Sequence, residues 1–189
     1  MPTMLDQPEI RERIHPISVA TYHALGETGL VDEKVELLRG YLVDKMSKSP
    51  LHSFICQRLV DWLRIATESS GQLVRQEQPL TFRDSEPEPD IAVVSGSRED
   101  FARSHPTIAD LVIEVAVNSV NADRAKAPIY AEAGIPMFLL IKPAEDAIEV
   151  FTAPENGEYR GHRVARAGDT IECPSVWSFS IVVDALFGA

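Results

Sequence analysis

The fold class follows from the run Leu111-Val-Ile-Glu114-Val-Ala-Val117. Apart from Glu114 the run is apolar and rich in β-branched residues, which is typical of a strand buried on both faces of a sheet. A second apolar run, Asp90-Ile-Ala-Val-Val94, comes directly after Glu86-Pro-Glu-Pro89. The alternating prolines exclude a helix and keep the backbone extended there. The sequence therefore predicts two short buried strands, each of which carries one acidic residue.

The residues that follow predict how the sheet continues. Residues 122–133 have a helical pattern that ends at Gly134, and Met137–Ile141 is a further buried strand. A strand, a crossover helix and another strand indicate an α/β core with a mixed central sheet.

Further elements are expected on both sides of this core. Apolar residues at helical spacing follow Ser49-Pro50, a favourable N-cap and first-turn pair, and predict a long helix with Gly71 as its stop. Two apolar runs flank Arg39-Gly40, which indicates a tight hairpin. The other expected elements are a helix over Ser18–Leu25, an extended segment over Leu73–Phe82, a hairpin of Ala147–Thr152 and Tyr159–Ala165, and a short helix over Ser180–Phe187.

Length and composition are those of an ordinary globular protein. The 189 residues are 44% hydrophobic and 25% charged, which predicts one domain over residues 1–189 with an irregular segment at residues 1–15. No apolar run is long enough to cross a membrane, and the N-terminus has no signal core, so we expect a cytoplasmic protein without membrane contact. Cys56 and Cys173 have no disulfide or metal-ligand spacing and are expected to be reduced.

The net charge of −11 argues against broad adhesion to nucleic acid or to anionic lipid. It does not exclude a local basic cleft, and acidic residues that hold a metal ion contribute to it.

Asp90 and Glu114 are the first candidates for a functional site. An ionised carboxylate in a buried strand costs several kcal/mol unless it is paired. If the two strands are neighbours, both carboxylates can point into one cleft, where a divalent cation would relieve their repulsion. Hard oxygen ligands suit Mg²⁺ or Mn²⁺. The alternative, equally open on this basis, is that Glu114 pairs with a lysine or arginine and that Asp90 only caps its strand.

Three more residues are candidates for the same cleft. Lys126 lies on the expected helix after the Glu114 strand, from which its ammonium can reach back and orient or deprotonate a water molecule. Glu36 interrupts an apolar hairpin strand, although a solvent-facing position in an alternating strand is slightly favoured. His52, in the first turn of the long helix, can contact a phosphate or a metal-bound water, although histidines there more often lie on the surface.

Taken in order, these segments resemble the Uma-type restriction endonuclease family of the PD-(D/E)XK nuclease superfamily. The motifs that carry the resemblance are Glu86-Pro-Glu-Pro-Asp90-Ile-Ala-Val-Val and Leu111-Val-Ile-Glu114-Val-Ala. The similarity covers nearly the whole chain and includes Pro16-Ile-Ser-Val, Val35-Glu-Leu-Leu-Arg-Gly-Tyr-Leu-Val, Met46-Ser-Lys-Ser-Pro-Leu-His52, Asp123-Arg-Ala-Lys-Ala-Pro-Ile-Tyr-Ala-Glu-Ala-Gly-Ile-Pro and Gly168-Asp-Thr-Ile.

The resemblance implies a restriction-endonuclease-like α/β core, in which helices flank a mixed central sheet. An N-terminal helix and hairpin and a C-terminal β-hairpin are additions to this core. The resemblance also implies a metal site at Asp90 and Glu114, with the carbonyl of Val115 as a further ligand. The superfamily lysine normally lies two residues after the strand glutamate. Ala116 occupies that position here, and Lys126 on the following helix matches the displaced lysine of the family.

The resemblance also changes the standing of Glu36, which matches the N-terminal glutamate of the family and joins the implied catalytic set. His52 matches a family histidine whose role is less defined.

The implied activity is Mg²⁺- or Mn²⁺-dependent endonucleolytic hydrolysis of DNA that leaves a 5′-phosphate and a 3′-hydroxyl. Two alternatives remain. The chain can be a binding or regulatory module with little catalysis, which Ala116 and the acidic charge favour, or a hydrolase of small phosphorylated substrates. A homodimer would suit cleavage of both strands of a duplex. Phe138 and Trp177 are candidates for its interface, although core packing is favoured for both.

Overall fold

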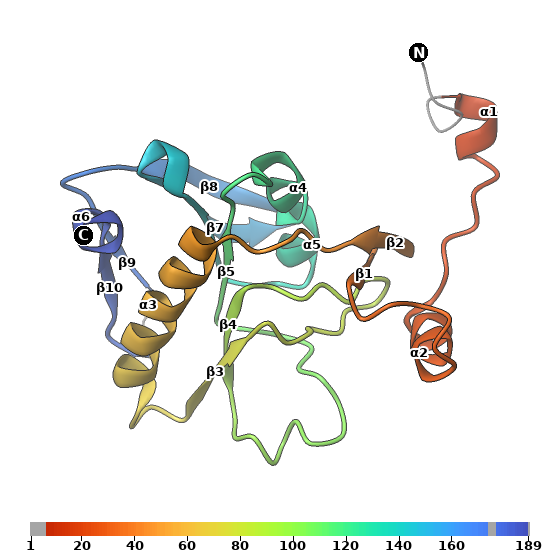
Figure 1. Ribbon diagram of the computed structural model, residues 1–189, viewed down its shortest axis with the longest axis horizontal. Coiled ribbons are helices and arrows are strands. Elements are labelled where there is room, and N and C mark those ends of the chain that lie inside the picture. Colours follow the sequence, from red (N-terminus) through yellow and green to blue (C-terminus); the bar gives the residue numbers. More distant parts are fainter. Residues whose placement is uncertain (1–6, 174–176, 189) are drawn as a thin grey trace.

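The computed structural model describes residues 7–173 and 177–188. Its centre is a six-stranded sheet in the order β3-β4-β5-β6-β7-β8 (Figure 1). Neighbouring strands are antiparallel except β5 and β6, which run parallel, so the predicted mixed sheet is confirmed. The strands are β3 (Gln72–Gln76), β4 (Ile91–Ser95), β5 (Leu111–Val115), β6 (Met137–Lys142), β7 (Ala147–Glu155) and β8 (Glu158–Ala165).

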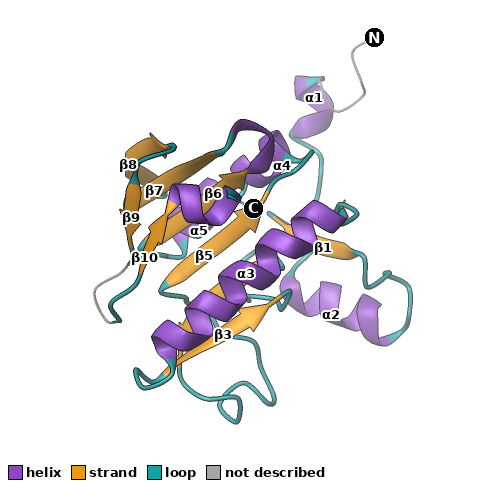
Figure 2. Ribbon diagram, turned by 60° about the vertical axis from the view of Figure 1, so that its left-hand side comes forward, coloured by secondary structure: helices purple, strands orange, loops and turns teal. Residues whose placement is uncertain are grey.

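β5 is buried on both faces, as its sequence predicts. Side chains alternate between the faces of a strand. Ile113 and Val115 join the cluster that packs under α3 (Pro50–Thr67), a long helix that lies across the sheet (Figure 2). Val112 joins the opposite cluster, which includes Tyr130 and Phe138. Glu114 therefore belongs to the side of the sheet that Tyr130 covers.

The crossover between β5 and β6 is not the single helix predicted over residues 122–133. It forms two short helices, α4 (Val120–Arg124) and α5 (Ala127–Glu132), with Lys126 at the junction. Pro128, at the start of α5, has no N–H to donate to Arg124, and its ring would clash with that carbonyl in a continuous helix. The break makes Lys126 the N-cap residue of α5.

The N-terminal additions lie beside the sheet. Of the segment 1–15, which was expected to be irregular, residues 1–6 lie outside the described residues, and residues 7–15 contain the short helix α1 (Pro8–Arg11). The predicted N-terminal helix is α2 (Val19–Glu27), and the predicted hairpin is β1 (Val35–Leu38) with β2 (Tyr41–Asp44). Both turn residues of this hairpin have positive φ, and a Cβ on Gly40 would lie 2.3 Å from the Cβ of Pro16, so this turn requires glycine.

The C-terminal region contains one correction. The helix predicted over Ser180–Phe187 is wrong in its first half, because Ser180–Val182 forms β10, which pairs with β9 (Thr170–Glu172). Only α6 (Val183–Phe187) is helical. A 3₁₀ turn at Pro143–Glu145 joins β6 to β7.

Two apolar side chains considered for an interface are core residues. Phe138 is fully buried and Trp177 is 3% exposed, so the core-packing interpretation is correct for both. Throughout the described part of the chain, no helix combines the length and apolarity needed to cross a membrane.

Candidate active site

One cavity, of about 430 Å³, brings the predicted site residues together. It lies where β1, the start of α3, the chain before β4, the end of β5 and the α4–α5 junction meet. All six of the residues singled out in the sequence line it: Glu36, His52, Asp90, Glu114, Val115 and Lys126.

Hydrogen bonds from backbone N–H groups to carboxylate oxygens connect Asp90 with the strand of Glu114. Asp90 comes directly before β4, which pairs with β5, so the two strands are neighbours as the site requires. The backbone N–H of Asp90 donates to Oε2 of Glu114 at 3.3 Å, and that of Val115 donates to Oδ2 of Asp90 at 2.7 Å. Both side chains are nearly inaccessible to solvent. The two carboxylates therefore face one buried space.

Lys126 connects two of the carboxylates. Its Nζ lies 2.9 Å from Oε1 of Glu36 and 3.1 Å from Oε1 of Glu114, and all three side chains are buried. Burial lowers the pKa of Lys126, but Glu114 and Glu36 raise it further, and the net result is a pKa above the ordinary value. Lys126 is therefore a charged ammonium. Glu114 does pair with a lysine, as the structural alternative required, but that lysine is the predicted site residue.

Glu114 is held by a residue that sequence reasoning missed. The hydroxyl of Tyr130, which is completely buried, donates to Oε1 of Glu114 at 2.7 Å. Tyr130 follows Lys126 by four residues, and this helical spacing was the available signal. Burial raises the pKa of Glu114 to about 8, and repulsion from Asp90 adds to the rise while Lys126 opposes it.

Glu36 and His52 are both buried, so the surface positions considered for them are wrong. Glu36 is 5% exposed, and its Oε2 accepts a hydrogen bond from the backbone N–H of Glu88 at 3.1 Å. His52 is 8% exposed, and its Nε2 lies 2.9 Å from Oδ1 of Asp90. The sequence did not show either burial because both depend on distant segments, β1 and α3, that pack against the chain before β4.

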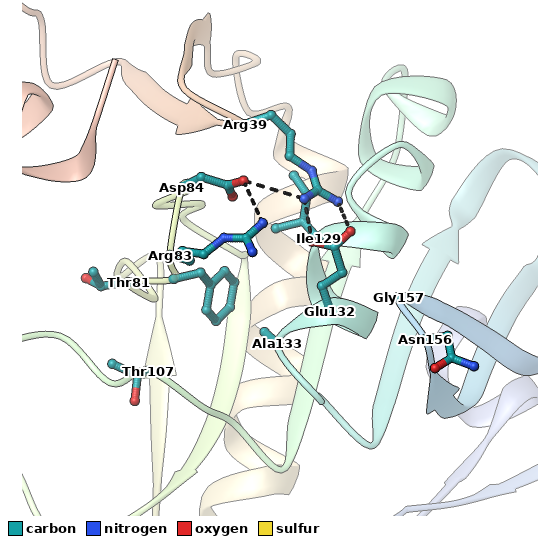
Figure 3. A pocket seen from close by; sticks show the side chains of 11 residues that line it. Arg39, Thr81, Arg83, Asp84, Thr107, Ile129, Glu132, Ala133, Asn156 and Gly157 are labelled. Carbon is teal, nitrogen blue, oxygen red and sulfur yellow. Dashed lines mark hydrogen bonds and ion pairs between the residues drawn. The ribbon is translucent and has the colours of Figure 1, made fainter. Parts of the chain in front are cut away.

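A larger hollow of about 660 Å³ lies elsewhere, lined by residues of the 81–84 turn, α5 and the β7–β8 turn (Figure 3). Its charged groups are already paired with one another. Arg39 donates to both carboxylate oxygens of Glu132 and lies 3.6 Å from Asp84, which also pairs with Arg83. These pairs leave no converging carboxylates for a cation, so the smaller cavity is the candidate active site.

A sequence model of the family described as "Uma2: Putative restriction endonuclease" matches residues 19–184. The chain belongs to the Uma2 family. This confirms the resemblance by which Lys126 and Glu36 were matched to residues of the family. The comparison with curated proteins finds no match.

The fold of this Uma2 protein is shared with a solved structure, described as the crystal structure of a "putative nuclease belonging to DUF820 from Anabaena variabilis ATCC 29413". The two chains are 22% identical and superpose with a TM-score of 0.76, over 91% of this chain and 98% of the other. At this identity the match establishes the fold, and it confirms the predicted restriction-endonuclease-like α/β architecture.

The side chains of the Uma2 site fit a hard divalent cation. Three buried carboxylates, from Glu36, Asp90 and Glu114, surround the single buried ammonium of Lys126. Even when Glu114 is protonated, as its raised pKa favours, Glu36 and Asp90 outnumber the one ammonium, so an excess of negative charge is left for a cation to balance. Oδ1 of Asp90 and Oε2 of Glu114 are the less committed oxygens, since Lys126 and Tyr130 both donate to Oε1 of Glu114. Oxygen donors of this kind suit Mg²⁺ and Mn²⁺.

Proposed function

We propose that this Uma2 protein is a Mg²⁺- or Mn²⁺-dependent endonuclease that hydrolyses phosphodiester bonds of DNA. The observation that carries the proposal is the convergence of four buried side chains, those of Asp90, Glu114, Glu36 and Lys126, in one cavity. The family and the fold are those of restriction-endonuclease-like nucleases. Metal dependence and the DNA substrate are the steps that we add.

Asp90 and Glu114 would hold the cation through Oδ1 and Oε2, the oxygens that Val115, Lys126 and Tyr130 do not contact, with the backbone carbonyl of Val115 as a further ligand. When bound, the cation supplies Lewis-acid stabilisation of the phosphate and lowers the pKa of a coordinated water. Tyr130 fixes the carboxylate of Glu114 by its hydrogen bond to Oε1, so Oε2 stays directed away from the tyrosine.

Lys126 acts as a cation in this proposal. Glu114 and Glu36 raise its pKa in the metal-free site, which favours the ammonium over the neutral amine that a general base requires. Instead its ammonium holds the attacking water by hydrogen bonding and stabilises the negative charge that develops on the phosphate. Glu36 positions that ammonium through its 2.9 Å ion pair. Ala116 leaves the usual lysine position without an amine, and Lys126 supplies one beside Glu114 from another element.

DNA would approach over the segment between β2 and α3. Lys45 and Lys48 of this segment line the cavity. Lys45 is paired with Glu88 at 3.0 Å and Lys48 with Glu77 at 2.5 Å, so both ammonium groups can exchange a carboxylate for a phosphate. With a net charge of −11 the protein would make few phosphate contacts, and its affinity for DNA should depend only modestly on salt.

The test is cleavage of supercoiled plasmid DNA with Mg²⁺ or Mn²⁺. We compare the wild-type protein with Glu114→Gln, and use Glu132→Gln from the larger hollow as a matched control. Even groups that only orient a metal ligand contribute 10–100-fold, so loss of the ligand in Glu114→Gln should slow cleavage by at least about 100-fold, and Glu132→Gln should cut like the wild type. Equal cleavage by the wild type and Glu114→Gln would refute the assigned site.

A second candidate substrate class is small phosphorylated molecules. The cavity volume of about 430 Å³ falls within the range of small-ligand pockets, and the acidic charge opposes duplex binding. The same catalytic groups would serve. Release of phosphate from nucleotides, with no cleavage of oligonucleotides or plasmid, would favour this candidate over DNA.

A further inference from the structure

A mixed cluster of metal-binding side chains shares Asp90 with the proposed catalytic site, and its other two members, His52 and Cys56, have no role in the proposed hydrolysis. His52 and Cys56 lie one turn apart on α3, a spacing that puts both on the same helix face. Asp90 approaches them from the start of β4. One donor atom from each of the three residues lies within 4.8 Å of the others, and all three residues are buried.

The distances suit a thiophilic cation. Sγ of Cys56 lies 3.7 Å from Nδ1 and 3.8 Å from Nε2 of His52, and Nε2 lies 2.9 Å from Oδ1 of Asp90. In a tetrahedral zinc site, bonds of about 2.0–2.3 Å place neighbouring donors roughly 3.3–3.6 Å apart. The three donor atoms lie within 4.8 Å of one another, so they are already close to this separation without a cation.

We propose that His52, Cys56 and Asp90 form a second cation site, which binds Zn²⁺ or another thiophilic divalent ion. Its nitrogen, sulfur and oxygen donors differ from the oxygen donors that select Mg²⁺. His52 and Asp90 line the cavity, so a water molecule entering from it can take the fourth position, as in zinc sites with three protein ligands.

Asp90 belongs to both sites, and this makes them exclusive. Its Oδ2 is held by the N–H of Val115, so Oδ1, which faces His52, is the oxygen available to either cation. Zn²⁺ at the second site removes this ligand from the catalytic pair and inhibits Mg²⁺-dependent cleavage. This consequence rests on the proposed function, whereas binding of the thiophilic ion does not.

Cys56 supplies a direct readout. The thiolate is the form of cysteine that binds a metal ion, so coordination by Cys56 can be followed spectroscopically. Cys173 is the other cysteine of the chain and the matched control: it is also free, and burial raises its pKa to about 12.

The experiment is a titration of the protein with Co²⁺, followed by absorption. The wild type and Cys173→Ala should both show a near-ultraviolet thiolate-to-cobalt charge-transfer band, and Glu114→Gln should keep it. Cys56→Ala should lose the band and bind Co²⁺ about 100-fold more weakly or worse, since even groups that only orient a metal ligand contribute 10–100-fold.

The proposal is overturned if the wild type gives no thiolate band, if the band persists in Cys56→Ala, or if Cys173→Ala or Glu114→Gln abolishes it. If Cys56→Ala fails to fold, the Co²⁺ spectrum of Cys173→Ala still tests the proposal, because any thiolate band must then come from Cys56, the one cysteine left in that variant. In plasmid cleavage with Mg²⁺, Cys56→Ala should need at least about tenfold more Zn²⁺ for half-inhibition than Cys173→Ala. If neither the wild type nor any variant cuts DNA, the proposed nuclease function is wrong. The Co²⁺ spectra then still test the second cation site, because they do not depend on cleavage.

Discussion

Replacing Lys126 with methionine should lower the stability of the metal-free protein and raise its affinity for Mg²⁺. The ammonium is 8% exposed and lies within 3.1 Å of both Glu36 and Glu114, whose side chains are 6% and 4% exposed. Removing one partner from a buried ion pair costs about 3–5 kcal/mol, because it leaves uncompensated charge. For a chain of this length that corresponds to a fall in Tm of roughly 6–20 °C.

Affinity for Mg²⁺ should change in the opposite direction. Lys126 competes with a cation for Glu114, and its loss also removes a repulsive positive charge at short range. We expect Mg²⁺ to bind Lys126→Met at least about tenfold more tightly, and saturating Mg²⁺ to recover part of the lost stability by binding only the folded state. The rate of cleavage should nevertheless fall by roughly 10²–10³, because the variant lacks the Lys126 ammonium that stabilises the negative charge on the phosphate.

The assays are urea denaturation with and without Mg²⁺, calorimetric titration and plasmid cleavage. Lys34→Met, at an exposed lysine, is the control and should match the wild type in all three. The reasoning is refuted if Lys126→Met binds Mg²⁺ more weakly than the wild type, or if it cuts DNA at the wild-type rate.

Three further outcomes are expected. Tyr130→Phe removes a donor from the buried carboxylate of Glu114 and should lower the free energy of unfolding by about 1–3 kcal/mol in urea, and an unchanged midpoint would count against the hydrogen bond. Hydrogen bonding to Arg124 lowers the pKa of Glu149 from 4.5 to about 2, although burial opposes the shift. Glu149 therefore stabilises the fold above its ordinary pKa, and this contribution is lost as pH falls from about 4.5 towards 2. Glu149→Gln should flatten the acid limb of a pH-dependent unfolding curve, and an identical limb would contradict the shift. DNA affinity, measured by fluorescence anisotropy, should be higher with Ca²⁺ than with a chelator, because any hard cation reduces the negative charge of the cavity; equal affinity would mean that DNA binds elsewhere.

The sequence predicted the acidic pair because each of the two ionisable residues lies in or directly before an apolar strand. Glu114 interrupts an apolar strand and Asp90 opens another, and both features are visible without tertiary structure. Lys126 was found from its place on the expected helix after the Glu114 strand and was then matched by the family pattern, although that helix is broken by Pro128. That proline was visible in the sequence, and its restriction on the backbone was sufficient reason to end one helix and begin another.

Other features depend on contacts between residues distant in the sequence. Val182 and its neighbours form a strand because β9 offers a partner, and three residues are too few to show a period of two. Glu36 is buried because its strand packs against the chain near Glu86, as shown by the hydrogen bonds between Leu37 and Glu86. Cys56 was considered only for disulfide and metal spacing with the other cysteine, so its position one turn after His52 was missed.

The acidic net charge and the proposed DNA substrate are compatible if the cation controls the local field. Without a cation the lining of the cavity has more acidic side chains than lysines even when Glu114 is protonated, so a phosphate that enters meets a net negative site. A divalent cation changes the local charge by two units and makes the same site attractive. The lysines at the rim are already paired with carboxylates, so they add little attraction until a phosphate displaces those partners. Attraction of DNA therefore depends on the cation more than on any basic surface, and a high negative charge over the rest of the protein limits adhesion to DNA that does not reach the site.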